Sequence, residues 1–164
     1  MIRRIVLLAG LILVPALSLH AQGLGDKVEL FGGYSYIHID NSPSFSTNGW
    51  ELAGEYKFMD WIGGVIDLDG NYNSPNALHT VLFGPQVSWP ARVSPFGHVL
   101  IGVAHGDTGP FTDNSFAAAI GGGIDARLVP HVYWRVFEGD YIPTHLFGVH
   151  ENNARISTGI VVHF

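Results

Sequence analysis

The sequence contains no cysteine, so a disulfide framework and a thiolate metal site are both excluded. The same absence removes the residue through which a bacterial lipoprotein carries its lipid. Charged residues make up only 13% of the chain, with 8 lysines and arginines and a net charge of −6. A basic surface for nucleic acid is therefore not expected, and no nucleic-acid partner is predicted.

Long apolar runs are also scarce, and the one that stands out lies at the N-terminus. It spans Ile5 to Leu19 and follows two arginines, which is the order found in a secretion signal. The run is shorter than the ~20 apolar residues that cross a bilayer as a helix, so a permanent anchor is the disfavoured alternative. We predict a signal peptide at residues 1–21, ending at Ala21, and one β-barrel domain at residues 22–164.

The rest of the chain has the character of short strands. Apolar and polar residues alternate along most of them, and their lengths approach the ~10 residues with which a tilted strand crosses a bilayer. Eight is also the smallest common number of strands in a membrane barrel, whose closure leaves no unpaired edge. The predicted strands are Val28–Asp40, Gly49–Phe58, Trp61–Tyr72, His79–Trp89, Val93–His105, Ser115–Arg127, His131–Ile142 and Ala154–Phe164.

The connections between these strands alternate in length. The second, fourth and sixth are tight turns, whereas the others are long and polar. Outer-membrane barrels have short turns on the periplasmic side and long loops outside, so this parity predicts that both ends of the mature chain lie in the periplasm. The long connections are expected at Asn41–Asn48, Asn73–Asn76, Gly106–Asn114 and Pro143–Asn153.

Alternation alone does not say which face of each strand points inward. A soluble, lipocalin-like carrier would bury the apolar face, whereas a membrane barrel would expose it to lipid. Aromatic residues near the strand ends favour the membrane barrel, because they gather at both membrane interfaces. The predicted girdles are Phe58, Trp61, Trp89, Tyr133, Trp134 and Phe164 at the periplasmic end, and Tyr36, Trp50, Tyr72 and Phe116 at the outer end.

The charged face of each strand is expected to line the interior. A basic residue facing lipid at mid-depth would cost ~2–4 kcal/mol, whereas charges inside a narrow barrel can pair. Arg135 and Asp140 are five residues apart, so both point inward only if a β-bulge interrupts the strand, which we predict near Glu138 and Gly139. The predicted interior charge network is Glu29, Glu51, Glu55, Lys57, Asp67, Asp69, Asp125, Arg127, Arg135, Asp140 and Arg155.

Several segments carry a family resemblance: residues 28–36, Phe83-Gly84-Pro85, Pro95-Phe96, Arg135 with Asp140-Tyr141, and the terminal Phe164. With them the chain resembles the eight-stranded outer-membrane barrels of the OmpA/OmpX type. The resemblance implies an all-β, eight-stranded antiparallel up-and-down transmembrane β-barrel in the cell outer membrane, in contact with its lipids. It also implies insertion by the barrel-assembly machinery, with Phe164 as the assembly signal. A monomer is expected.

Such barrels share no single activity, because they serve as anchors, adhesins, small channels and a few enzymes. We predict a non-enzymatic barrel without a cofactor, structural or interacting through its four outer loops. The His150-Glu151-Asn152 segment faintly resembles a lipid A deacylase site, but Asn152 stands where the nucleophilic serine is needed. Nine histidines show no recognised ligand spacing, so no metal site is predicted. A narrow channel is the alternative to a plugged interior.

Overall fold

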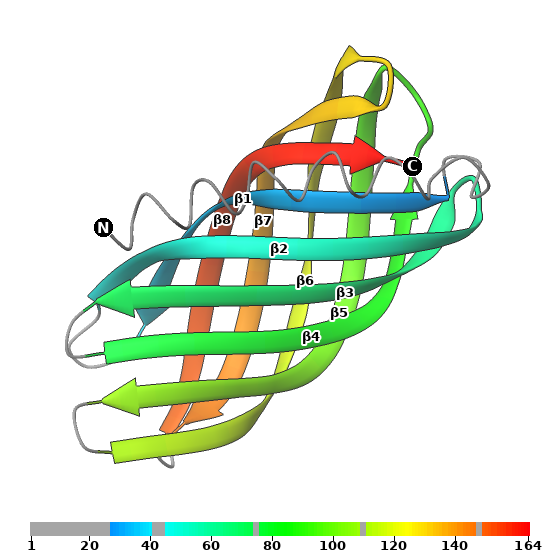
Figure 1. The fold of residues 1–164 in the computed structure, drawn as a ribbon. Helices are drawn as coiled ribbons and strands as arrows, with labels where there is room; N and C mark the ends of the chain where they lie inside the picture. The colour runs from blue at the N-terminus through cyan, green and yellow to red at the C-terminus, as the bar shows by residue number, and fades with distance from the viewer. Residues whose placement is uncertain (1–26, 41–44, 74–75, 109–110, 147–148) are drawn as a thin grey trace.

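The computed structural model describes residues 27–40, 45–73, 76–108, 111–146 and 149–164 (Figure 1). Eight antiparallel strands form a closed barrel in which each strand pairs with its neighbours in sequence and β8 closes onto β1. The predicted all-β, eight-stranded antiparallel up-and-down barrel is thereby confirmed. The strands are β1 (Val28–Asp40), β2 (Phe45–Met59), β3 (Ile62–Asn73), β4 (Asn76–Ser88), β5 (Val93–Thr108), β6 (Phe111–Val129), β7 (Val132–Leu146) and β8 (Val149–His163).

We call the end of the barrel that holds Val28 and Phe164 the terminal end, and the opposite end the distal end. Among the described residues no helix is long and apolar enough to cross a bilayer. The predicted signal peptide, residues 1–21, lies outside the described residues. Strand pairing reaches the last residue, because the Phe164 backbone N–H donates to the Val28 carbonyl oxygen at 2.8 Å.

The strands extend further at the distal end than the sequence predicts. β2 begins at Phe45, β6 begins at Phe111 and β7 continues to Leu146, so much of each connection predicted as a loop is a paired hairpin. Backbone pairing needs only N–H and C=O groups, so it continues where the side chains are no longer alternately apolar and polar. The hairpin tips, residues 41–44, 74–75, 109–110 and 147–148, lie outside the described residues.

The barrel is apolar outside and charged inside. Large apolar side chains such as Ile66 and Ile120 are each 58% exposed on the outer face, whereas Asp67 and Arg155 are each 1% exposed in the interior, which we call the lumen. Apolar side chains also fill part of the lumen; those buried there include Phe31, Ile37, Leu82, Leu100 and Val161. A soluble barrel with an apolar ligand cavity has the reverse arrangement.

Most of the predicted girdle residues face outward, as Trp89 and Phe116 do with exposed fractions of 71% and 66%. Tyr133 is the exception, and its placement in the girdle was wrong. Its ring stacks on that of His163 with centroids 4.2 Å apart, at the mouth of the lumen. The neighbouring Trp134, also predicted for the girdle, does face outward.

A β-bulge does interrupt β7, but it lies at Val136 and Phe137 rather than at Gly139. Arg135 pairs with Gly159 of β8 and Glu138 pairs with Ser157. Val136 and Phe137 therefore stand together opposite the single residue Thr158 of β8. Strand pairing continues through Gly139. Val136 and Phe137 both face outward, and this pair of consecutive apolar residues was the sequence signal for the bulge.

At Gly159 the seam between β1 and β8 leaves no room for a side chain. A Cβ atom there would lie 2.3 Å from the carbonyl oxygen of Gly32 and 2.4 Å from Cα of Gly33. Because both are backbone atoms, the strands that close the barrel would have to move. We expect Gly159→Ala to lower the free energy of unfolding by ~1–3 kcal/mol, measured by urea unfolding in detergent. Gly97→Ala is the control, since its Cβ would lie 3.6 Å from its nearest neighbour; equal losses would contradict the argument.

Candidate functional site: the charge network of the lumen

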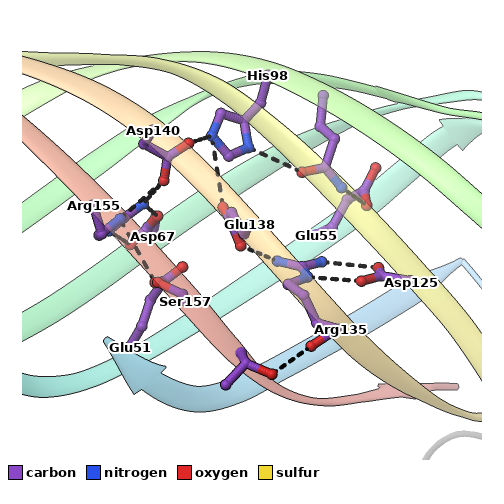
Figure 2. A network of polar contacts seen from close by, with 12 residues as sticks. Glu51, Glu55, Asp67, His98, Asp125, Arg135, Glu138, Asp140, Arg155 and Ser157 are labelled. Atoms are coloured by element: carbon purple, nitrogen blue, oxygen red, sulfur yellow. Dashed lines mark hydrogen bonds and ion pairs between the residues drawn. The ribbon is translucent and has the colours of Figure 1, made fainter. Parts of the chain in front are cut away.

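Arg155 of β8 is the centre of one group of charges (Figure 2). Its Nη2 donates to Asp67 Oδ2 at 2.6 Å and to Asp140 Oδ2 at 2.7 Å, and its Nη1 donates to Asp69 Oδ2 at 2.8 Å. Its Nε lies 3.6 Å from Glu51 Oε2. Through these contacts the one guanidinium links β8 to β2, β3 and β7 across the lumen. The side chain is fully buried.

Arg135 of β7 is the centre of a second group. It makes a bidentate pair with Asp125, with Nε–Oδ1 and Nη2–Oδ2 distances of 2.9 and 3.0 Å, and its Nη1 donates to Glu138 Oε2 at 2.7 Å. The guanidinium carbon lies 4.3 Å from the ring centroid of Phe31 and 4.2 Å from that of Phe96. Both aromatic faces can attract the cation, so the pair and the rings hold its plane in place.

His98 of β5 connects the two groups. Its Nε2 lies 2.8 Å from Asp140 Oδ1 and 3.7 Å from Glu138 Oε1, so it reaches a carboxylate of each arginine group. Its Nδ1 lies 3.4 Å from Gln86 Oε1, and the Gln86 amide donates to Glu55 Oε2 at 2.6 Å. The polar contacts of the lumen therefore form a chain that continues from one arginine group to the other (Figure 2).

At the terminal end the lumen opens into a mouth of about 640 Å³. Lys57 Nζ pairs there with Glu29 Oε1 at 2.8 Å, and His163 Nδ1 lies 3.3 Å from the same oxygen. Arg127 also lines this mouth, but it is exposed and makes no ion pair within the described part of the chain. Arg127 therefore lies at the exposed mouth and not in the buried network for which it was predicted.

Apart from Lys57, which is half-buried, and Arg127, every predicted network residue is buried in the lumen. Sequence reasoning missed Glu138 and His98, which are 1% and 5% exposed. The bulge was predicted too far along β7, and a regular strand up to that point would place Glu138 on the outer face. For His98 the signal was the row of outward-facing apolar residues Val99, Ile101 and Val103 on β5. Because side chains alternate along a strand, the adjacent His98 must then face the lumen.

The middle of the lumen is filled rather than open. The cavity beside Arg135, Glu138 and His98 has a volume of about 10 Å³, which is near the minimum for a single water molecule. Filling of this kind is expected for eight strands, whose interior is just wide enough for side chains. At mid-depth the described residues form ion pairs and hydrogen bonds with one another, and they leave no open binding chamber.

The fold and the lumen together define a class: an eight-stranded barrel of the outer-membrane type, with an apolar outer face and a charge-filled interior. The predicted resemblance is confirmed at the level of the fold. No protein-family model and no curated protein sequence matches the chain.

Solved structures of the same fold are similar over most of the chain. Neisserial surface protein A has 14% sequence identity and a TM-score of 0.67, covering 84% of this chain and 97% of that one. Ail, the attachment invasion locus protein of Yersinia pestis, has 16% identity and a TM-score of 0.56, covering 82% and 97%. The N-terminal barrel domain of Pseudomonas aeruginosa OprF has 11% identity and a TM-score of 0.53, covering 85% and 98%.

Proposed function

We propose that the chain is an integral protein of the cell outer membrane, in contact with its lipids. The observation that carries this is the reversal of the barrel, with apolar side chains exposed all round and the charged ones enclosed. Exposure of such an apolar surface to water is unfavourable, whereas its contact with the hydrocarbon core of a bilayer is favourable. In this proposal the terminal end faces the periplasm, and Phe164, whose backbone pairs with β1, is the assembly signal for insertion.

The membrane location is tested by fractionation and gel migration. We expect the chain to be recovered with outer membranes and to migrate differently on a gel with and without boiling, because a closed barrel resists detergent until heated. A control sample unfolded in urea before loading should give only the unfolded band. Recovery in the soluble periplasmic fraction would contradict the proposal and favour a soluble carrier.

We further propose a structural or interacting role for the distal hairpins rather than catalysis. The sequence places no lysine or arginine in any of the four hairpins, whereas aspartate, asparagine and histidine are frequent. Ail has been solved in complex with sucrose octasulfate, a heparin analogue. Without basic residues, these hairpins are unsuited to such a polyanion, so an uncharged or cationic partner fits this surface better.

The alternatives of a channel and an enzyme have less support. A conducting path would have to pass Arg155 and its four carboxylates, where the lumen is filled. For the deacylase alternative, the side chains of His150 and Glu151 lie outside the described residues, whereas Asn152 is exposed and accepts a hydrogen bond from the Tyr141 hydroxyl. An amide cannot replace the nucleophilic hydroxyl.

A further inference from the structure

Carboxylates outnumber cations in the lumen. Burial of an unneutralised carboxylate is strongly unfavourable, so the excess requires a further positive charge, either protons or a bound cation. Among the described residues the cations paired with them are Lys57, Arg135 and Arg155, and His98 and His163 add to these when protonated. The buried carboxylates are Glu29, Glu51, Glu55, Asp67, Asp69, Asp125, Glu138 and Asp140.

Three of these carboxylates meet between the two arginine groups. One oxygen each of Glu51, Asp67 and Glu138 lies within 4.8 Å of the others, although the residues come from β2, β3 and β7. Glu51 is 2% exposed, and its Oε1 is buried without a hydrogen-bond partner. An unpaired buried oxygen in an acidic cluster is costly unless a positively charged ligand contacts it.

The second oxygens of the two glutamates are held by neighbours. Glu51 Oε2 accepts a hydrogen bond from the Ser157 hydroxyl, and Glu138 Oε2 accepts one from Arg135 Nη1 at 2.7 Å. The remaining Glu138 Oε1 lies 3.7 Å from His98 Nε2, which is beyond hydrogen-bond length. Each glutamate is thus oriented through one oxygen and has the other available for a ligand, as outer contacts orient carboxylates at metal sites.

We propose that Glu51, Asp67 and Glu138 bind a single Ca²⁺ ion in the lumen. Ca²⁺ takes oxygen ligands at about 2.3–2.6 Å in a flexible geometry, which suits carboxylates that come from three different strands. Mg²⁺ requires a strict octahedron and usually keeps several waters, for which the filled lumen leaves little room. Three carboxylates without nitrogen or sulfur are also a poor site for Zn²⁺.

A second group of possible ligands, His98, Glu138 and Asp140, is a weaker candidate. The His98 Nε2 that would bind a metal is already 2.8 Å from Asp140 Oδ1. Asp140 pairs with Arg155, as Asp67 does in the first group, so the two groups differ in the engaged nitrogen and not in this ion pair. A nitrogen ligand would also favour Zn²⁺ over Ca²⁺.

The proposal is tested on the whole barrel, unfolded in urea and refolded in detergent with CaCl₂ or with EDTA. After desalting, bound calcium is measured by mass spectrometry, and folding is checked by gel migration without boiling. We expect a single Ca²⁺ per barrel and a higher urea midpoint with Ca²⁺ than with an equal concentration of Mg²⁺. If the refolded wild-type barrel holds no calcium, or if its urea midpoint is the same in Ca²⁺ and in Mg²⁺, the proposal is overturned. Protons would then neutralise the excess carboxylates.

The matched variants are Glu51→Gln and Glu55→Gln, which each remove one buried carboxylate from the lumen. Only Glu51 belongs to the proposed site, so we expect its variant to lose Ca²⁺ affinity about tenfold or more, with Glu55→Gln close to wild type. Equal losses of Ca²⁺ affinity in the two variants would mean that the negative charge of the whole lumen attracts the ion, not a specific site, and would overturn the proposal. Preferential Zn²⁺ binding that disappears in His98→Gln would likewise overturn it. If Glu51→Gln fails to fold, the wild-type comparison of Ca²⁺ with Mg²⁺ still decides.

Discussion

Replacing Arg155 by alanine is expected to lower the free energy of unfolding by about 5 kcal/mol, which is comparable to the whole stability of many domains. The buried guanidinium pairs with Asp67, Asp69 and Asp140 at 2.6–2.8 Å, and Glu51 lies 3.6 Å away. Its removal leaves these carboxylates in the lumen without their cation. The measurement is urea unfolding in detergent followed by tryptophan fluorescence, together with the folded fraction on an unboiled gel.

A second substitution tests whether the loss comes from unpaired charge. In the variant Arg155→Ala with Asp67→Asn, one of the stranded carboxylates is gone, so we expect part of the lost stability to return relative to Arg155→Ala alone. Simple loss of side-chain packing would give no such recovery. An unchanged unfolding midpoint in Arg155→Ala, or additive losses in the double variant, would contradict the role assigned to this residue.

The second large effect is expected on the outer face. Ile66 is 58% exposed near the middle of β3, so in the proposed membrane placement Ile66→Arg would put a cation at mid-depth in the bilayer. We expect a loss of ~2–4 kcal/mol in the free energy of unfolding, measured in lipid vesicles. A soluble barrel would tolerate the same change, because an exposed surface substitution usually alters stability by less than about 0.5 kcal/mol.

The control for this variant is Val93→Arg. Val93 begins β5 at the terminal end and is 59% exposed, so it matches Ile66 in exposure but not in depth. A basic residue near the interface is expected to cost only about 0–1 kcal/mol. Equal effects at the two positions would show that depth does not matter, which would contradict the membrane placement.

The number of strands could be predicted because each strand repeats its pattern every two residues, and their direction because the connections alternate in length. The distal ends could not, since β2 starts at Phe45 and β6 at Phe111 among residues without that alternation. Tyr133 was misplaced for a related reason. An aromatic residue near a strand end is compatible with either face, and only its stacking on His163 shows that it turns toward the mouth of the lumen.

The candidate site was predictable in part. Alternation placed Arg155 and Asp67 on the charged face of their strands, and the cost of charges in lipid assigned that face to the interior. Their contact could not be predicted, because it joins residues 88 positions apart. Glu138 depended on the position of a bulge, which a sequence pattern locates only within a few residues. The unpartnered Glu51 Oε1 could not be predicted at all, since it follows from how the neighbouring side chains divide the available hydrogen bonds.

The sequence by itself determined that the chain forms eight alternating strands, because the two-residue period is a local property of each segment. It also determined which charged residues share a face. Alternation is the same whichever way a sheet curves, so the inward direction of this face was an expectation until the closed barrel showed it. Only the tertiary structure decided which partners meet across the lumen, because those contacts join residues far apart in the sequence. Closure of β8 onto β1 brings Glu51, Asp67, Glu138 and Arg155 within reach of one another, and that enclosure gives the lumen its chemistry.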